Sequence, residues 1–144
     1  MNFKKKLVMF NIGDCQKIVL PTAKSVEGNL IALENGVHLP FDVRRVYYLY
    51  DVPFGSRRGG HAHKNLKQYL IAVSGSFTVT VDDGSNQQHV FMNNPSEALY
   101  LPPGIWREIH NFSSGSICLV LASAEFSEAD YIRDYSSFLS YRGL

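Results

Sequence analysis

Residues 55–63 read Gly-Ser-Arg-Arg-Gly-Gly-His-Ala-His and contain the most informative pattern in the sequence. Side chains two positions apart lie on the same face of a β-strand. We therefore expect His61 and His63 to point together into the space that a sheet encloses, with Ala62 facing away. Taken alone, the pair is explained equally well by one hydrogen-bonded core histidine and one histidine at a rim.

The segments on either side are short, rich in β-branched and aromatic residues, and separated by turn residues, which is typical of all-β proteins. Apolar and polar residues alternate over Phe77–Val81, and Asp82-Asp83-Gly84 follows, so this region is predicted to form a hairpin. The predicted strands are Gln16–Leu20, Asn29–Glu34, Arg44–Tyr50, Lys67–Val73, Ser76–Val81, Gln87–Met92, Ala98–Leu101, Arg107–Asn111 and Ser116–Ala122.

The C-terminal segment has the residue spacing of an amphipathic helix. After Ser127, apolar side chains recur at helical intervals at Tyr131, Ile132, Tyr135, Phe138 and Leu139. We expect one short helix that begins near Ser127, closes the chain and lies across the outside of the sheets.

Composition excludes several classes of protein. The 144 residues include 14 Lys and Arg against 13 Asp and Glu, so the formal net charge of +1 creates no broad field for nucleic acid or an anionic membrane. No apolar run is long enough for a transmembrane helix, and Leu7–Ile12 is too short for a secretory signal. We expect one domain, residues 1–144, working in the cytoplasm, with Cys15 and Cys118 as free structural thiols.

The histidine pair and its neighbours resemble the first motif of the cupin superfamily. That motif contains Gly, His-x-His, Glu and Gly, and Gly55, His61, His63 and Gly75 stand in the same register. Gln68 occupies the position of the motif's glutamate. One of the metal ligands of this motif is therefore replaced by a neutral amide.

The second cupin motif contains Pro-x-Gly, His and Asn. It is matched by Pro102, Gly104 and Asn111, with Arg107 in place of the histidine. The two motifs together imply an all-β fold of the cupin type, a double-sheet jelly roll or β-barrel, with a short C-terminal helix.

The two substitutions argue against a metal site. An amide in place of a carboxylate weakens metal binding, and a permanent guanidinium cation repels the ion. We therefore expect no bound metal, which leaves His61 and His63 free for proton transfer at a pKa of about 6.5. A degenerate cupin that only binds a small molecule is the alternative.

Other polar side chains are expected to line the same cavity. Strand alternation turns several of them inward, and a Gly-Gly pair lets the backbone beside two arginines approach a ligand. On its own, the tyrosine of this set is more readily explained as a core aromatic, and the paired arginines are explained equally well as part of a solvated loop. The set comprises Arg45, Tyr47, Arg57, Arg58, Gln68, Arg107 and Asn111.

Longer motifs occur in a fixed order along nearly the whole chain. They are Arg45–Tyr48, Arg58–Lys64, Val81–Gly84, Asn111–Ser114, Leu119–Ser123 and Asp130–Tyr135. Together they resemble the dTDP-4-keto-6-deoxyglucose 3,4-ketoisomerases. This family consists of cupins without metal or other cofactor, typically homodimeric. Their dTDP-3-keto-6-deoxyhexose products usually pass to an aminotransferase that makes deoxyamino sugars for cell-surface glycans, such as lipopolysaccharide O-antigens or S-layers, or for antibiotics.

The resemblance implies a role for each residue. Moving a ketone from C4 to C3 requires removal of the C3 proton, an enediol, and return of a proton to C4. His61 is expected to be the base, His63 its partner in proton return or orientation, and Tyr47 a hydroxyl donor to sugar oxygens. Arg58 and Arg45 are expected to hold the diphosphate.

The face of the enediol that receives the proton decides between a gluco and a galacto product. Arg107 and Glu27, in the loop Ser25–Gly28, are candidates for this choice. We favour the gluco product, because a guanidinium cannot deliver a proton as an imidazole can. A cupin 3,5-epimerase, a metal-dependent cupin and a non-enzymatic sugar-nucleotide-binding cupin are the alternatives.

Overall fold

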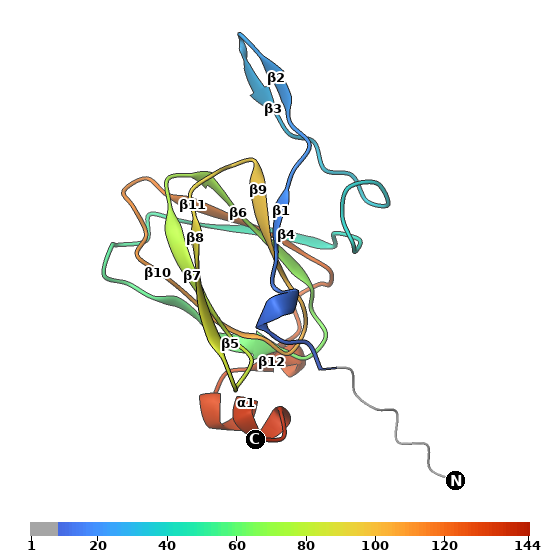
Figure 1. Ribbon diagram of the computed structural model, residues 1–144, viewed down its shortest axis with the longest axis vertical. Helices are drawn as coiled ribbons and strands as arrows, with labels where there is room; N and C mark the ends of the chain where they lie inside the picture. The colour runs from blue at the N-terminus through green and yellow to red at the C-terminus, as the bar shows by residue number, and fades with distance from the viewer. Residues whose placement is uncertain (1–8) are drawn as a thin grey trace.

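Two five-stranded antiparallel sheets face each other in the computed structural model, which describes residues 9–144 (Figure 1). The N-terminal residues 1–8, which include part of the apolar run considered above, lie outside the described residues. The first sheet has the order β1 (Lys17–Val19), β9 (Glu97–Leu101), β6 (Gln68–Ser74), β11 (Ile117–Ala122) and β4 (Arg45–Tyr50). The second has the order β12 (Tyr131–Ile132), β5 (Arg58–His63), β10 (Trp106–His110), β7 (Phe77–Asp82) and β8 (Gln87–Met92). This arrangement confirms the predicted all-β, cupin-like fold.

The main core lies between the two sheets. Its side chains come from alternate positions of strands in both sheets, as the period of two requires. Leu70, Val79 and Leu101 are at most 2% exposed, and Leu49 and Tyr47 pack against this cluster. Burial of each such aliphatic side chain stabilises the fold by roughly 1.5–3 kcal/mol. This packing fixes the positions of the strands that carry both the core side chains and the polar side chains predicted above.

The predicted hairpin after Val81 is confirmed. Strands β7 and β8 pair from Phe77 opposite Met92 to Asp82 opposite Gln87, and Gly84 in the turn has φ +90°. The turn is held by the Asp83 carboxylate, which accepts hydrogen bonds from the backbone N–H groups of Ser85 and Asn86.

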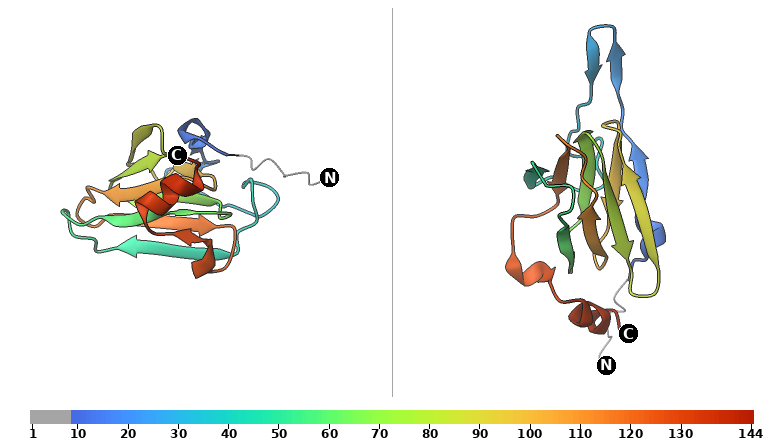
Figure 2. Two further views of the ribbon diagram at one scale, coloured as in Figure 1. Left: turned by 90° about the horizontal axis from the view of Figure 1, so that it is seen from below. Right: turned by 90° about the vertical axis from the view of Figure 1, so that its left-hand side faces the viewer.

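One predicted strand is wrong. Residues Asn29–Glu34 were expected to form a single strand, but only β3 (Gly28–Leu30) forms, and it pairs with β2 (Ala23–Ser25). The β2–β3 hairpin projects from the barrel at the end opposite the C-terminal helix (Figures 1 and 2). The apolar residues that follow, such as Ile31 and Leu33, instead pack on the outer face of the first sheet.

The predicted helix is also shorter than expected. Only α1 (Tyr135–Tyr141) is helical, whereas Glu128–Asp130 forms a 3-10 turn and Tyr131–Ile132 pairs with β5 as β12. Asp134 caps α1 by accepting a hydrogen bond from the Ser137 N–H at 2.9 Å, which fixes its start. Phe138 packs on Ala62 and Trp106, so α1 lies on the outside of the second sheet as predicted. Nowhere in residues 9–144 is there a helix with the length and apolarity needed to cross a lipid bilayer.

Candidate active site

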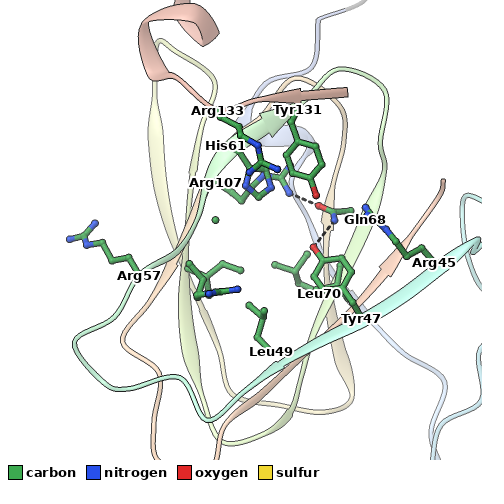
Figure 3. A pocket seen from close by; sticks show the side chains of 14 residues that line it. Arg45, Tyr47, Leu49, Arg57, His61, Gln68, Leu70, Arg107, Tyr131 and Arg133 are labelled. Carbon is green, nitrogen blue, oxygen red and sulfur yellow. Dashed lines mark hydrogen bonds between the residues drawn. The ribbon is translucent and has the colours of Figure 1, made fainter. Parts of the chain in front are cut away.

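A cavity of about 420 Å³ opens between the two sheets (Figure 3). Its floor is apolar, and its upper wall carries aromatic, amide and basic groups. No carboxylate lines it within the part of the chain that the structure describes. The lining residues are Arg45, Tyr47, Leu49, Arg57, Arg58, Gly59, His61, Gln68, Leu70, Arg107, Ile109, Val120, Tyr131 and Arg133. Five of these are arginines, so the cavity favours an anionic ligand.

A β-bulge aims His61 into this cavity. The pairing of β5 with β10 shifts register between Arg107, which faces His61, and Glu108, which faces Gly59. Gly59 has φ +84°, and a Cβ there would lie 3.0 Å from the backbone oxygen of Arg107. Only glycine suits this position, because both the positive φ and the close backbone approach exclude a side chain. The Gly-Gly pair therefore orients His61 against Arg107.

Three side chains form a directed hydrogen-bond chain across the cavity. Arg107, which is 3% exposed, donates from Nη1 to Gln68 Oε1 and from Nε and Nη2 to the Ile105 carbonyl at 3.3 and 3.2 Å. Gln68 Nε2 then donates to Tyr47 Oη at 3.0 Å. Because Tyr47 accepts from Gln68, its own O–H hydrogen is directed elsewhere. Desolvation raises the pKa of Tyr47, so this phenol stays protonated as a donor.

His61 is a neutral imidazole in this environment. Burial and the Arg107 guanidinium both disfavour its cation and lower its pKa to about 3, well below the value expected from sequence. A neutral ring nitrogen inside a cationic cavity can accept a proton from a bound molecule. The site therefore combines a proton acceptor, His61, with a proton donor, Tyr47.

His63 lies behind His61 and does not line this cavity, which corrects the expectation that both rings face one space. It is fully buried, and its ring packs edge-on against His61 with centroids 4.8 Å apart. Its Nδ1 donates to Asp130 Oδ2 at 3.0 Å, which assigns the Nδ1–H tautomer. Burial and Arg107 lower the pKa of His63 to about 2.

Two other predicted site residues also lie outside the cavity. Asn111 was expected to face inward by alternation from Arg107, but β10 ends at His110 and Asn111 turns with φ +55° into solvent. Glu27 lies exposed in the turn of the β2–β3 hairpin, which projects from the barrel. The cavity is lined by the remaining predicted residues, including Arg45 and Arg57.

Two lining residues with polar side-chain groups, Tyr131 and Arg133, were missed by the sequence analysis. Both were assigned to a helix, although their alternation with Ile132, which is 7% exposed and packs under α1, has the period of a strand. The Arg133 guanidinium lies 4.1 Å from the centroid of the Tyr131 ring and pairs with Glu128 at 2.6 Å. The inward face of β12 thus completes the cavity wall.

The positions that bind metal in other cupins hold Gln68 and Arg107, which are hydrogen-bonded to each other. Residues 9–144 contain no cluster of three or more His, Cys, Asp or Glu that could bind an ion. This donor set does not fit a metal cofactor.

Comparison with known proteins identifies the family. Residues 13–143 match the family model described as FdtA: WxcM-like, C-terminal. The chain is 43% identical over 114 residues to TDP-4-oxo-6-deoxy-alpha-D-glucose-3,4-oxoisomerase from Aneurinibacillus thermoaerophilus, covering 79% of this chain and 82% of the relative. The TDP-quinovose 3,4-ketoisomerase of Campylobacter jejuni is 44% identical with a TM-score of 0.84, covering 88% of this chain and 98% of its own.

A further solved relative is a variant of the 3,4-ketoisomerase from Thermoanaerobacterium thermosaccharolyticum in complex with TDP-4-keto-6-deoxyglucose. It is 35% identical with a TM-score of 0.87, covering 88% of this chain and 92% of its own. The family match spans nearly all of the described residues, and two of these relatives exceed 40% identity. The chain therefore belongs to the FdtA family of sugar 3,4-ketoisomerases, and it is an isomerase.

Proposed function

We propose that the protein converts dTDP-4-keto-6-deoxyglucose into a dTDP-3-keto-6-deoxyhexose by acid/base enolisation without a metal or other cofactor. The observation that carries this proposal is that the neutral His61 and the Tyr47 donor line the same cavity, together with five arginines. The relatives from A. thermoaerophilus and T. thermosaccharolyticum act on or bind the same sugar nucleotide. We further propose that this product supplies the biosynthesis of deoxyamino sugars for surface glycans.

The proposed chemistry begins with proton removal at carbon. His61 takes the proton from C3, and the Tyr47 hydroxyl donates to O4, where negative charge develops. Arg107 strengthens this donor, because it polarises the Gln68 amide that donates to Tyr47. The O3 hydroxyl loses its proton and O4 gains one, His61 returns the C3 proton to C4, and the electron pair left on O3 forms the carbonyl at C3.

The arginines are proposed to hold the diphosphate. Arg58 is exposed at the cavity wall, and Arg57 pairs with Glu108 at 3.1 Å, so Arg58 is the freer of the two for an anion. Arg45 lies over the Tyr47 ring at 5.4 Å and is placed closer to the sugar. A planar guanidinium group can bind two phosphate oxygens at once through two N–H donors, which suits this role.

His63 is proposed to orient His61 and not to return the proton. Its polar hydrogen is directed to Asp130, whose other oxygen accepts the Asn65 N–H at 2.8 Å. Its Nε2 is buried and contacts no hydrogen-bond partner among the described residues. A ring fixed in this way supports the face of His61 without reaching the substrate.

We propose the gluco product. Arg107 occupies the position of the cupin histidine, and its guanidinium stays charged and hydrogen-bonded to Gln68, so it cannot act as a second acid. The 44% identical relative from C. jejuni is a TDP-quinovose 3,4-ketoisomerase. NMR of the product reports the C4 configuration directly, and a galacto product would contradict this assignment.

The activity is tested by incubating purified protein with dTDP-4-keto-6-deoxyglucose and following the 3-keto sugar by NMR. His61→Asn is expected to reduce the rate by at least about 100-fold. The matched control is His89→Asn, which alters an exposed histidine on the outside of β8. Exchange at C5 in deuterated water would instead identify a 3,5-epimerase, and ligand-induced thermal stabilisation without product would identify a binding protein.

We propose that the protein is a homodimer. The outer face of the first sheet exposes Val46 and Tyr48, with relative accessibilities of 57% and 59%, and the β2–β3 hairpin exposes Leu30 at 62%. A two-stranded hairpin alone is marginally stable, and clustered exposed apolar side chains mark interfaces. A second copy of the chain is the proposed occupant. Light scattering is expected to give twice the mass of the chain, and Val46→Glu is expected to give the monomer.

We also propose a cytoplasmic location. Cys15 and Cys118 are both free and buried, as is usual for proteins of reducing compartments.

A further inference from the structure

Asp130 lies behind the cavity wall, directly before β12, and is tied to the end of β5 by three hydrogen bonds. Its Oδ2 accepts from His63 Nδ1 at 3.0 Å, its Oδ1 accepts from the Asn65 N–H at 2.8 Å, and its carbonyl oxygen accepts from the Lys64 N–H at 2.9 Å. Asp130 does not line the cavity that contains His61. Any effect of this carboxylate on the reaction therefore acts through His63.

The two ring nitrogens of His63 have different surroundings. Nδ1–H donates to Asp130, so the neutral ring carries its lone pair at Nε2. Nε2 is buried and has no hydrogen-bond partner among residues 9–144. The His61 ring packs edge-on against the His63 ring, with centroids 4.8 Å apart. Asp130 therefore decides which edge of His63 carries a hydrogen close to the proposed base.

The position of this hydrogen matters because His61 becomes positively charged when it takes the proton from C3. The cation forms in a cavity that five arginines and, within residues 9–144, no carboxylate line. A hydrogen on Nε2 of His63 would place the positive end of another dipole near this cation, whereas a lone pair places the negative end there. The Nδ1–H tautomer thus stabilises the charge that develops on His61.

We propose that Asp130 is a positioning residue for the isomerisation, which holds His63 in the Nδ1–H tautomer and so keeps a lone pair at Nε2; this inference rests on the proposed function. The Asn65 N–H occupies Oδ1 of Asp130, which leaves Oδ2 for His63. Neither Asp130 nor His63 gains or loses a proton during the reaction. Their hydrogen bond only fixes the dipole beside His61.

The same geometry predicts what Asp130→Asn does. The Asn65 N–H requires an oxygen acceptor, so the new amide turns its NH2 group toward His63. Because that group donates, Nδ1 must accept, and the ring hydrogen moves to Nε2, where no acceptor exists among the described residues. We expect kcat to fall by about 100-fold and KM to stay within about threefold, as for a base held by the wrong tautomer.

NMR of protein labelled with 15N in its histidine rings reports the tautomer directly, and His63→Asn identifies the signals of this ring. We expect the hydrogen on Nδ1 of His63 in the unmodified protein and on Nε2 in Asp130→Asn. The matched control is Asp134→Asn, at the N-cap of α1, where an amide caps a helix as well as a carboxylate does. It is expected to change neither the tautomer nor kcat.

A double variant separates action through His63 from a general loosening of the chain around Asp130. In the His63→Asn background, Asp130→Asn is expected to lower kcat by less than about threefold further, because the ring through which Asp130 acts is absent. The thermal midpoint of each variant verifies that the fold is kept.

A hydrogen on Nε2 of His63 in the unmodified protein would overturn the inference, and this measurement needs no variant. Loss of rate in Asp130→Asn with the Nδ1–H tautomer kept would overturn it, as would an unchanged rate with the hydrogen moved, or equal losses with and without His63. None of these results would affect the proposed function. Absence of the 3-keto product with the unmodified protein would instead overturn the proposed function, while the tautomer of His63 would stay as measured.

Discussion

The neutral histidines His61, which is partly buried at the cavity wall, and His63, which is fully buried, make the stability of the fold depend on pH. Burial and Arg107 lower the pKa to about 3 for His61 and to about 2 for His63. In the unfolded chain both return to a pKa of about 6.5. Below that pH the unfolded state binds more protons than the folded state, so the free energy of unfolding falls as the solution is acidified.

The size of this effect follows from the two pKa values. Between pH 7 and pH 5, protonation of the unfolded chain removes about 2 kcal/mol for each histidine, or about 4 kcal/mol for the pair. The loss continues toward pH 3, where His61 begins to titrate in the folded state. The loss of about 4 kcal/mol between pH 7 and pH 5 is roughly a third or more of the free energy of unfolding of a typical domain.

Urea unfolding at pH 5, 6 and 7 measures this loss. The fluorescence of Trp106, the single tryptophan, reports unfolding because its ring packs under α1. His61→Asn and His63→Asn are each expected to halve the difference in the free energy of unfolding between pH 7 and pH 5. The same change at the exposed His89 should leave this difference unchanged. A difference below about 1 kcal/mol in the unmodified protein would refute the lowered pKa values of the two imidazoles. The proposed base would then titrate close to its ordinary pKa of about 6.5 in the folded protein.

Three further results are expected. The kcat/KM of the unmodified protein should stay constant from pH 8 to about pH 5, and Arg107→Gln should move its acid limb to higher pH, because Arg107 lowers the pKa of His61. Tyr47→Phe should lower the free energy of unfolding by about 1–3 kcal/mol in urea titrations, because it leaves the buried Gln68 amide without its acceptor. Phe138→Ala, at a fully buried position under α1, should cost about 3–5 kcal/mol by the same measurement, with the isomerisation rate unchanged at 25 °C.

The residues that could be predicted from the sequence are those governed by local periodicity. Strand β8 matches its predicted bounds, Gln87–Met92, because its alternation and the Asp-Gly turn before it act over a few residues. Alternation on one strand also placed Arg45 and Tyr47 together in the cavity. His61 and Arg107 meet because the two cupin motifs pair as antiparallel strands.

The errors arise where a long-range contact decides the local structure. Tyr131 and Ile132 fit a helical spacing, but their backbone groups pair with β5, and this pairing ends the extended segment before α1. Asn111 fits the inward face of β10, but its positive φ turns the chain before that residue. His63 has the inward direction that alternation predicts, yet the ring of Tyr131 fills the space in front of it. None of these contacts has a signature within a short window of sequence.

The substitutions at positions 68 and 107 depend on each other. Arg107 alone would be a buried cation without a side-chain acceptor, and the Gln68 oxygen satisfies it. This bond also determines the orientation of the amide, because its oxygen faces Arg107 and its nitrogen must face Tyr47. A glutamate at position 68 would pair with Arg107 equally well, but it would accept the Tyr47 hydrogen and direct it away from the cavity. An amide is therefore the side chain that both satisfies the cation and leaves Tyr47 as a donor, so the replacement of the metal ligands and the donor that the proposed enolisation requires depend on the same hydrogen bonds.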